Sequence, residues 1–182
     1  MTIRRLLNTL FVLPLAPLVL VGCVGMPDGV KPVQDFELDR YLGKWYEIAR
    51  LDHSFERGMQ NVTAEYSLRD DGGVRVLNRG FVTSKGEWSE AEGKAFFVED
   101  ADTGYLKVSF FGPFYGSYVV FDLDDDYQYA FISGPDTSYL WLLARRPEVD
   151  DALMQRFKSR AGKLGFDLNE LIVVDHSPRQ DM

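Results

Sequence analysis

The sequence predicts an all-β fold: an eight-stranded antiparallel up-and-down barrel with a C-terminal α-helix packed outside it. Beyond Gly43, apolar stretches recur about every 10 to 15 residues, a spacing typical of short strands rather than of alternating strands and helices. Clusters of Gly, Pro and Asp separate these stretches, as they do at turns. Eight strands of this kind suit a closed barrel wide enough for one small ligand.

The composition fits one folded domain. Of the 182 residues, 46% are hydrophobic and 14% are aromatic, which is too rich for a disordered chain. The formal net charge is -8 and no basic patch is visible, so we expect no nucleic acid partner. Cys23 is the only cysteine, which excludes an intramolecular disulfide and leaves no thiol in the folded body for metal or nucleophilic chemistry.

The amino terminus has the layout of a secretory signal. Arg4 and Arg5 precede an apolar run at residues 10–21, which is followed by Gly22 and Cys23. The run holds about 12 residues against the roughly 20 that a bilayer needs, and two prolines interrupt it, so we do not expect a membrane span. The alternative is an ordinary signal peptide followed by a stray buried cysteine.

The residues after the signal divide into a spacer, a barrel and a tail. Residues 24–34 contain Gly and Pro without any periodicity, which predicts a flexible linker. We therefore expect a signal peptide at 1–22, a linker at 23–34, the barrel domain at 35–176 and a tail at 177–182.

The eight strands are placed by the apolar stretches, and the turns by the residues between them. We expect strands near residues 43–50, 61–69, 74–82, 87–98, 105–111, 115–123, 127–133 and 139–145. Turns are expected at residues 70–73, 102–104, 111–113 and 124–126.

Alternation indicates which side chains face the interior, because successive residues of a strand point to opposite faces. In the second strand, Val62, Ala64 and Tyr66 share an apolar face opposite Thr63 and Glu65. The expected cavity residues are Val62, Ala64, Tyr66, Val76, Trp88, Val108, Phe110, Tyr118 and Trp141. The alternative is that these side chains fill a solid core.

After the strands, the period of the apolar residues changes. From residue 148 onward, Val149, Leu153, Phe157, Ala161 and Leu164 recur at spacings of four and three, which predicts an amphipathic helix over residues 148–163 on the outside of the barrel. Gly165 is a suitable C-terminal stop, and residues 171–174 form one more short strand.

A transmembrane barrel is the rival with the same strand count. It would turn its apolar face outward to lipid and fill its interior with polar groups. Charged residues of the strands, such as Glu65, Lys94 and Lys107, speak against this rival, because a charge on a lipid-facing strand costs about 2 to 4 kcal/mol. We therefore favour the barrel with an apolar interior.

Three segments, in order, resemble the signatures of the lipocalin family. The first is at residues 43–45, the second falls at 134–139 and the third at 143–147. The resemblance implies that Gly43 and Trp45 close one end of the barrel and that Arg145 lies across Trp45. A guanidinium stacked on an indole is worth about 0.5 to 2 kcal/mol.

Residues 45–50, 108–116 and 139–141 resemble more specifically the bacterial branch of that family, outer-membrane lipoproteins related to apolipoprotein D. The resemblance covers residues 35–175. The second signature departs from the usual Thr-Asp-Tyr, since this chain has Gly134-Pro135-Asp136. The implied function is binding, storage or transport of a hydrophobic ligand, such as a fatty acid or a lysophospholipid, in the cell envelope.

Residues 20–23 are similar to a lipobox, the signal for lipid attachment in bacterial lipoproteins. The resemblance implies that Cys23 carries an S-diacylglycerol and an N-acyl chain such as palmitate, and several acyl chains make attachment effectively permanent. Val24, where an inner-membrane lipoprotein would have Asp, indicates an outer-membrane anchor facing the periplasm.

The two ends of the barrel are expected to differ in chemistry. Loops alternate between the ends, so the Trp45 end collects the acidic turns, whereas the other end carries an aromatic rim. The rim residues are Phe55, Met59, Phe111, Phe114 and Tyr115. We hypothesise that this rim approaches the membrane surface. The alternative is that these residues are solvated hairpin tips. A homodimer formed through the rim is also possible, but nothing in the sequence requires it.

We expect no catalytic site, no metal and no cofactor. His53 and His176 are the only histidines and lie far apart in the sequence, and no nucleophile elbow, phosphate loop or zinc pattern occurs. Glu47 is the one acidic residue whose strand position points it inward, where it would orient a ligand head group. Two alternatives remain: a structural or adaptor lipoprotein with a filled barrel, and a lipid-modifying enzyme that uses Glu47.

Overall fold

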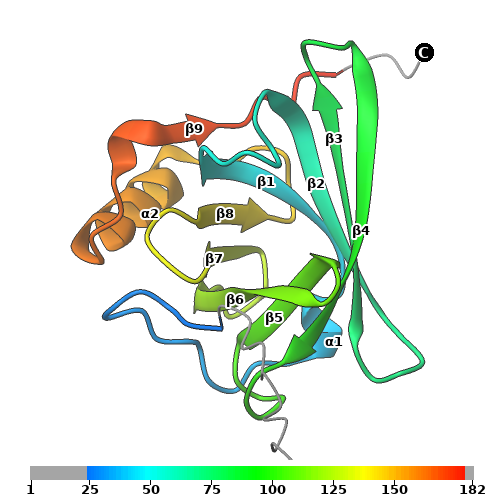
Figure 1. Ribbon diagram of the computed structural model, residues 1–182. Helices are drawn as coiled ribbons and strands as arrows, with labels where there is room; N and C mark the ends of the chain where they lie inside the picture. Colours follow the sequence, from blue (N-terminus) through cyan, green and yellow to red (C-terminus); the bar gives the residue numbers. More distant parts are fainter. Residues whose placement is uncertain (1–23, 179–182) are drawn as a thin grey trace, which may run out of the picture.

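The computed structural model describes residues 24–178 of the chain. Within these residues nine strands form one antiparallel sheet (Figure 1). Strands β1 to β8 close into a barrel, because each pairs with the next along the chain and β8 pairs with β1. The elements are α1 (Leu38–Tyr41), β1 (Gly43–Leu51), β2 (Met59–Leu68), β3 (Val74–Val82), β4 (Glu87–Phe97), β5 (Tyr105–Phe111), β6 (Phe114–Leu123), β7 (Tyr129–Ser133), β8 (Leu140–Ala144), α2 (Asp151–Lys163), η1 (Leu168–Glu170) and β9 (Leu171–Val173). The predicted fold class is confirmed.

Two short elements were not expected from the sequence. The single turn of α1 lies at the Trp45 end of the barrel, and the 3-10 turn η1 joins α2 to β9. β9 pairs with β1 outside the closed barrel. None of the helices in residues 24–178 is long and apolar enough to cross a membrane.

A bulge in β1 decides which of its residues face inward. The register with β8 shifts between Glu47 and Ala49, so that Arg50 pairs with Trp141. An extra residue in one strand reverses the alternation beyond it. Glu47 and Arg50 therefore both lie on the inner face, although three positions separate them.

Two apolar clusters stabilise the domain on opposite faces of the sheet. The inner cluster fills part of the barrel around Trp45, Val120 and Ile132. The outer cluster lies between the sheet and α2, where the Phe157 and Phe131 ring centroids are 4.9 Å apart. Helix α2 begins at an N-cap where the Asp150 carboxylate accepts a hydrogen bond from an amide of the first turn. The expectation of an outside helix is confirmed (Figure 1).

The segment 24–34, expected to be a flexible linker, packs on the barrel instead. Val30 is buried in the outer cluster, and Val24 packs against it. Val33 donates a backbone hydrogen bond to Val120 and accepts one from Gly104, both at 2.9 Å. Composition did not reveal this because the bonds are made with distant strands. The expectation of a spacer is therefore wrong for these residues, since burial and hydrogen bonds offset the entropy of ordering them.

Candidate functional site

The barrel interior contains a cavity of about 100 Å³. One water needs roughly 10 to 15 Å³ on such a scale, so the interior is not a solid core. The lining residues are Phe36, Leu38, Tyr41, Glu47, Phe55, Glu56, Val62, Thr63, Ala64, Tyr66, Val74, Val76, Asn78, Ala95, Leu106, Val108, Phe110, Ser117, Tyr118, Trp141 and Leu143. Most of these side chains are apolar or aromatic, as a binding site for a hydrophobic ligand requires.

A second hollow of about 310 Å³ adjoins the cavity at the end opposite Trp45. Its walls include Met59, Phe111 and Phe114, which lie at the ends of β2, β5 and β6. The two hollows share the lining residues Phe55, Glu56, Val62, Asn78 and Phe110. We call the outer hollow the mouth, because it connects the cavity with the surface.

Nine of the ten residues expected at the cavity line it, Glu47 among them, and Trp88 does not. Trp88 pairs with Phe81 on the outer face of β3 and β4, where the Arg79 guanidinium lies 3.8 Å from the indole centroid. The assignment of Trp88 is therefore wrong. The reason is that β4 turns small residues such as Ala91 and Gly93 inward, so its large side chain does not mark the apolar face.

Other cavity residues were not predicted, and only some of them lie at positions that the alternation along a strand points inward. Val74, Ala95 and Leu106 follow the same alternation and could have been found. Phe36 and Tyr41 reach the cavity from α1 and its flank, and Glu56 reaches it from the loop after β1, where no periodicity applies.

The Trp45 end of the barrel is closed by a stack. The Arg145 guanidinium carbon lies 3.9 Å from the Trp45 ring centroid, and the Trp45 indole N–H donates to the Tyr41 carbonyl at 2.7 Å. Arg145 also donates to the carbonyls of Lys44 at 2.9 Å and Arg40 at 2.7 Å. Gly43 begins β1 with a φ of 87°, a conformation that favours glycine. The arrangement implied by the family signatures is present here.

Three phenols lie above this stack on the cavity floor. The Tyr118 hydroxyl is 2.6 Å from that of Tyr41 and 2.9 Å from that of Tyr66. Burial raises the pKa of all three phenols above the ordinary value, so they stay neutral. The floor is polar but carries no charge.

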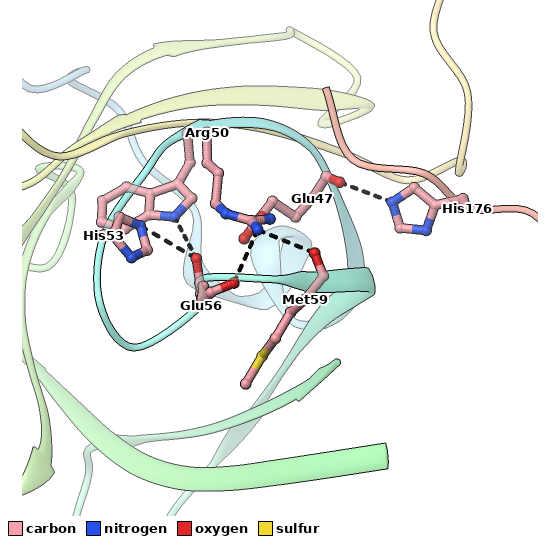
Figure 2. A network of polar contacts seen from close by, with 7 residues as sticks. Glu47, Arg50, His53, Glu56, Met59 and His176 are labelled. Carbon is pink, nitrogen blue, oxygen red and sulfur yellow. Dashed lines mark hydrogen bonds and ion pairs between the residues drawn. The ribbon is translucent and has the colours of Figure 1, made fainter. Parts of the chain in front are cut away.

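A polar cluster formed by Glu47, Arg50, His53 and Glu56 is drawn in Figure 2. It lies at the end of the cavity beside the mouth, because Glu47 lines the cavity and Glu56 lines both hollows. Arg50 donates to the Glu47 carboxylate at 2.6 Å, and its second terminal nitrogen donates to the carbonyls of Glu56 at 2.9 Å and Met59 at 3.1 Å. Both partners of the ion pair are almost fully buried. The guanidinium thus joins β1 to the loop between β1 and β2 and to the first residue of β2.

Glu56 is the second carboxylate of this cluster. Its Oε2 accepts a hydrogen bond from the Trp141 indole N–H at 3.2 Å, and the His53 ring nitrogen Nε2 lies 3.3 Å from the same oxygen (Figure 2). Burial, followed by the charge of Arg50, lowers the pKa of His53 to about 4, so this ring is neutral at pH 7. Burial raises the pKa of both Glu56 and Glu47, and the charge of Glu56 raises that of Glu47 further.

The two histidines lie in different parts of the fold and make different contacts. His53 stacks on Phe55 with centroids 4.0 Å apart, whereas His176 contacts the Glu47 backbone carbonyl at 2.8 Å and fixes the chain after β9. Across residues 24–178, no group of three or more His, Cys, Asp or Glu could hold a metal ion.

The mouth carries exposed aromatic side chains. Phe111 is 79% exposed, Phe114 is 71% exposed and Phe55 is 51% exposed, whereas Met59 and Tyr115 are partly buried. Exposed large apolar residues that gather at one place indicate contact with a membrane or another molecule. We call Phe55, Phe111 and Phe114 the aromatic rim.

Comparison with known proteins agrees, over the whole domain, with the family resemblance seen in the sequence. A family model described as a lipocalin-like domain matches residues 36–176. The chain is 63% identical to the outer membrane lipoprotein Blc of Vibrio cholerae, over 88% of this chain and 94% of that protein. It is 51% identical to the outer membrane lipoprotein Blc of Escherichia coli K12, over 81% of this chain and 84% of that protein. Insecticyanin of the tobacco hornworm Manduca sexta has a similar fold, with a TM-score of 0.65 and 22% identity over 84% of this chain and 87% of that one.

Proposed function

The chain belongs to the lipocalin family, and from this membership we propose that it binds, stores or transports a lipid with one acyl chain, such as a fatty acid or a lysophospholipid. It is a bacterial lipocalin of the outer membrane, like its relatives at 51% to 63% identity. The observation that carries the proposal is the apolar cavity with its open mouth. Each methylene that enters such a cavity contributes about 0.8 kcal/mol.

Family and relatives point to a binding protein rather than an enzyme. We propose that Glu47 serves binding rather than turnover, because its carboxylate is already held by Arg50. The competing reading, a structural or adaptor lipoprotein, requires a barrel that takes up no lipid.

Uptake of a fluorescent fatty acid separates these two readings. Residues 24–178 form a closed barrel with its own core, so the chain from Val24 onward is a suitable test protein. We expect binding in the micromolar range or tighter. Val108→Phe, which adds volume inside the cavity, should weaken it at least about tenfold. Leu77→Phe makes a similar change on the outer face of β3 and should have no effect. A folded domain that binds no lipid would refute the carrier function.

We also propose that Cys23, which lies outside the described residues, is acylated and holds the mouth against the membrane. The described chain starts at this end, since a Cβ on Gly25 would lie 4.0 Å from the carbonyl of Pro135 in the loop between β7 and β8. The aromatic rim belongs to the same end. The acidic turns at the Trp45 end would then point away from anionic head groups.

Vesicle flotation of the unacylated chain tests the rim. We expect Phe111→Ser with Phe114→Ser to lower the fraction bound to phosphatidylethanolamine–phosphatidylglycerol vesicles. The control is Leu68→Ser, which removes a 58% exposed side chain at the Trp45 end. Equal binding of the wild type and the rim variant would refute membrane docking. If the rim instead joins two copies, the wild type will be dimeric and the rim variant monomeric in solution.

A further inference from the structure

The floor of the cavity carries three phenol hydroxyls whose hydrogen bonds run only between themselves. Tyr118 is the middle one: its oxygen lies 2.6 Å from the Tyr41 oxygen and 2.9 Å from the Tyr66 oxygen. Within residues 24–178 no further hydrogen bond reaches these hydroxyls. All three side chains line the cavity, so a ligand that fills it to the floor meets them. We call this group the phenol triad.

The phenol triad has one hydrogen-bond donor too many. Three hydroxyls bring three O–H protons, and the two contacts between them use two of these protons. One O–H therefore has no acceptor within the triad, whichever way the protons point. Burial raises the pKa of each phenol, so all three keep their protons at neutral pH. The oxygens also keep unused lone pairs, because a phenol oxygen accepts as well as donates.

The far end of a bound acyl chain lies at this triad. Val62 lines both the cavity and the mouth, and Tyr66 lies four residues further along β2. At a rise of about 3.3 Å per residue, the triad is about 13 Å from the junction of cavity and mouth. The walls between them are mainly apolar, with side chains such as Ala64, Val76 and Val108. A chain whose head group stays at the mouth therefore brings its other end to the floor.

An ordinary acyl chain matches the walls but not the floor. Its terminal methyl group neither donates nor accepts a hydrogen bond, so it leaves the third O–H of the triad buried without a partner. A buried polar group without a partner is unfavourable, and a ligand that supplies the partner gains affinity.

We propose that the cavity selects acyl chains that carry a neutral oxygen function, a hydroxyl or a carbonyl, at the end away from the head group, and that Tyr41, Tyr66 and Tyr118 bind this oxygen. The inference rests on the proposed carrier function and names a second recognition point in the same cavity. The ligand oxygen accepts the third O–H, and a ligand hydroxyl donates in return to a free lone pair of the triad.

The oxygen at the floor is neutral rather than charged. Arg145, beneath the triad, directs its N–H groups to the backbone carbonyls of Tyr127, Lys44 and Arg40. A carboxylate on the floor would thus be buried without a charged hydrogen-bond partner, which costs far more than the burial of a hydroxyl. The head group stays at the mouth, so fatty acids and lysophospholipids both remain ligands.

The first test varies the chain length with the wild-type protein. Octanoate, dodecanoate and tetradecanoate are compared with their ω-hydroxy derivatives by displacement of a bound fluorescent fatty acid. In the shortest pair the hydroxyl meets the apolar wall, so 8-hydroxyoctanoate should bind at least about tenfold more weakly than octanoate. In a longer pair the hydroxyl reaches the triad, and there the hydroxy acid should bind at least as tightly as the plain acid.

The second test removes the triad. Tyr41→Phe combined with Tyr66→Phe and Tyr118→Phe keeps the rings and deletes every hydroxyl, and replacing all partners of a hydrogen bond by apolar groups of the same shape is nearly neutral for stability. This variant should bind dodecanoate as well as the wild type does, and 12-hydroxydodecanoate at least about tenfold more weakly than dodecanoate. Tyr46→Phe deletes a phenol hydroxyl on the outer face of the barrel and should leave both affinities unchanged.

The outcomes separate the two proposals. If the plain acids bind and the ω-hydroxyl weakens binding at every length, or at none, the carrier function stands and the oxygen site is overturned. The site is also overturned if the triple variant folds and loses dodecanoate, because the carboxylate and not the far end would then lie on the phenols. If no acid binds, the carrier function is refuted and this inference with it. The length comparison uses the wild type, so it decides the matter even if the triple variant does not fold.

Discussion

Removal of the Arg145 side chain tests the closure of the barrel. The guanidinium stacks on the fully buried Trp45 and donates two short hydrogen bonds to the carbonyls of Lys44 and Arg40. The stack is worth about 1 kcal/mol, and each of these bonds about 1 kcal/mol net. We therefore expect Arg145→Ala to lower the free energy of unfolding by about 3 kcal/mol.

Urea denaturation followed by circular dichroism gives this free energy. Arg145→Lys keeps a cation near the ring but loses the planar fork that spans two carbonyls, so it should lose about half of the effect of Arg145→Ala. Arg146→Ala, at the next and exposed position, is the matched control and should change stability by less than about 0.5 kcal/mol. A loss below about 1 kcal/mol for Arg145→Ala would refute the reasoning.

Three further predictions concern other parts of the fold. Phe157→Ala should lower the free energy of unfolding, measured in urea, by about 3 to 5 kcal/mol, because the side chain is fully buried between α2 and the sheet. A loss below about 2 kcal/mol would show that the neighbouring side chains fill the space that the ring leaves. Gly43→Ala should cost about 1 to 2 kcal/mol from backbone strain, since its φ is 87° and the new Cβ meets nothing closer than 3.7 Å, whereas Gly116→Ala, at an ordinary φ, should cost little. Because the pKa of His53 is lowered to about 4 in the folded protein, the unfolded chain takes up a proton at a higher pH than the folded protein does. The stability of the wild type relative to His53→Gln should therefore fall by up to about 3 kcal/mol as the pH drops from 6.5 to about 4. Parallel pH profiles of the two proteins would contradict the burial of a neutral ring.

The position of residues 24–34 changes how the anchor acts. A flexible spacer would let the domain turn relative to the membrane. The observed packing of Val30 and the hydrogen bonds of Val33 hold the chain on the barrel from Val24 onward. If Cys23 is acylated, the orientation of the mouth is set by the fold and not by chance.

The sequence by itself determined the architecture and its closed end. The strands, their turns and helix α2 followed from local periodicity, because a strand repeats every two residues and a helix every 3.6. The signature residues Trp45 and Arg145 indicated the stack, which the structure contains at 3.9 Å. Alternation also placed nine cavity residues, since burial on one face of a strand is itself a local pattern.

Only the tertiary structure decided the details that give the cavity its chemistry. The bulge in β1 reverses alternation and brings Arg50 inside, and no local pattern in the sequence marks where a register shifts. Trp88 faces outward because small side chains of β4 are needed inside. Glu56 reaches the cavity from the loop after β1, where no periodicity applies. These positions depend on contacts between segments far apart in the chain, which a reading of local periodicity cannot supply.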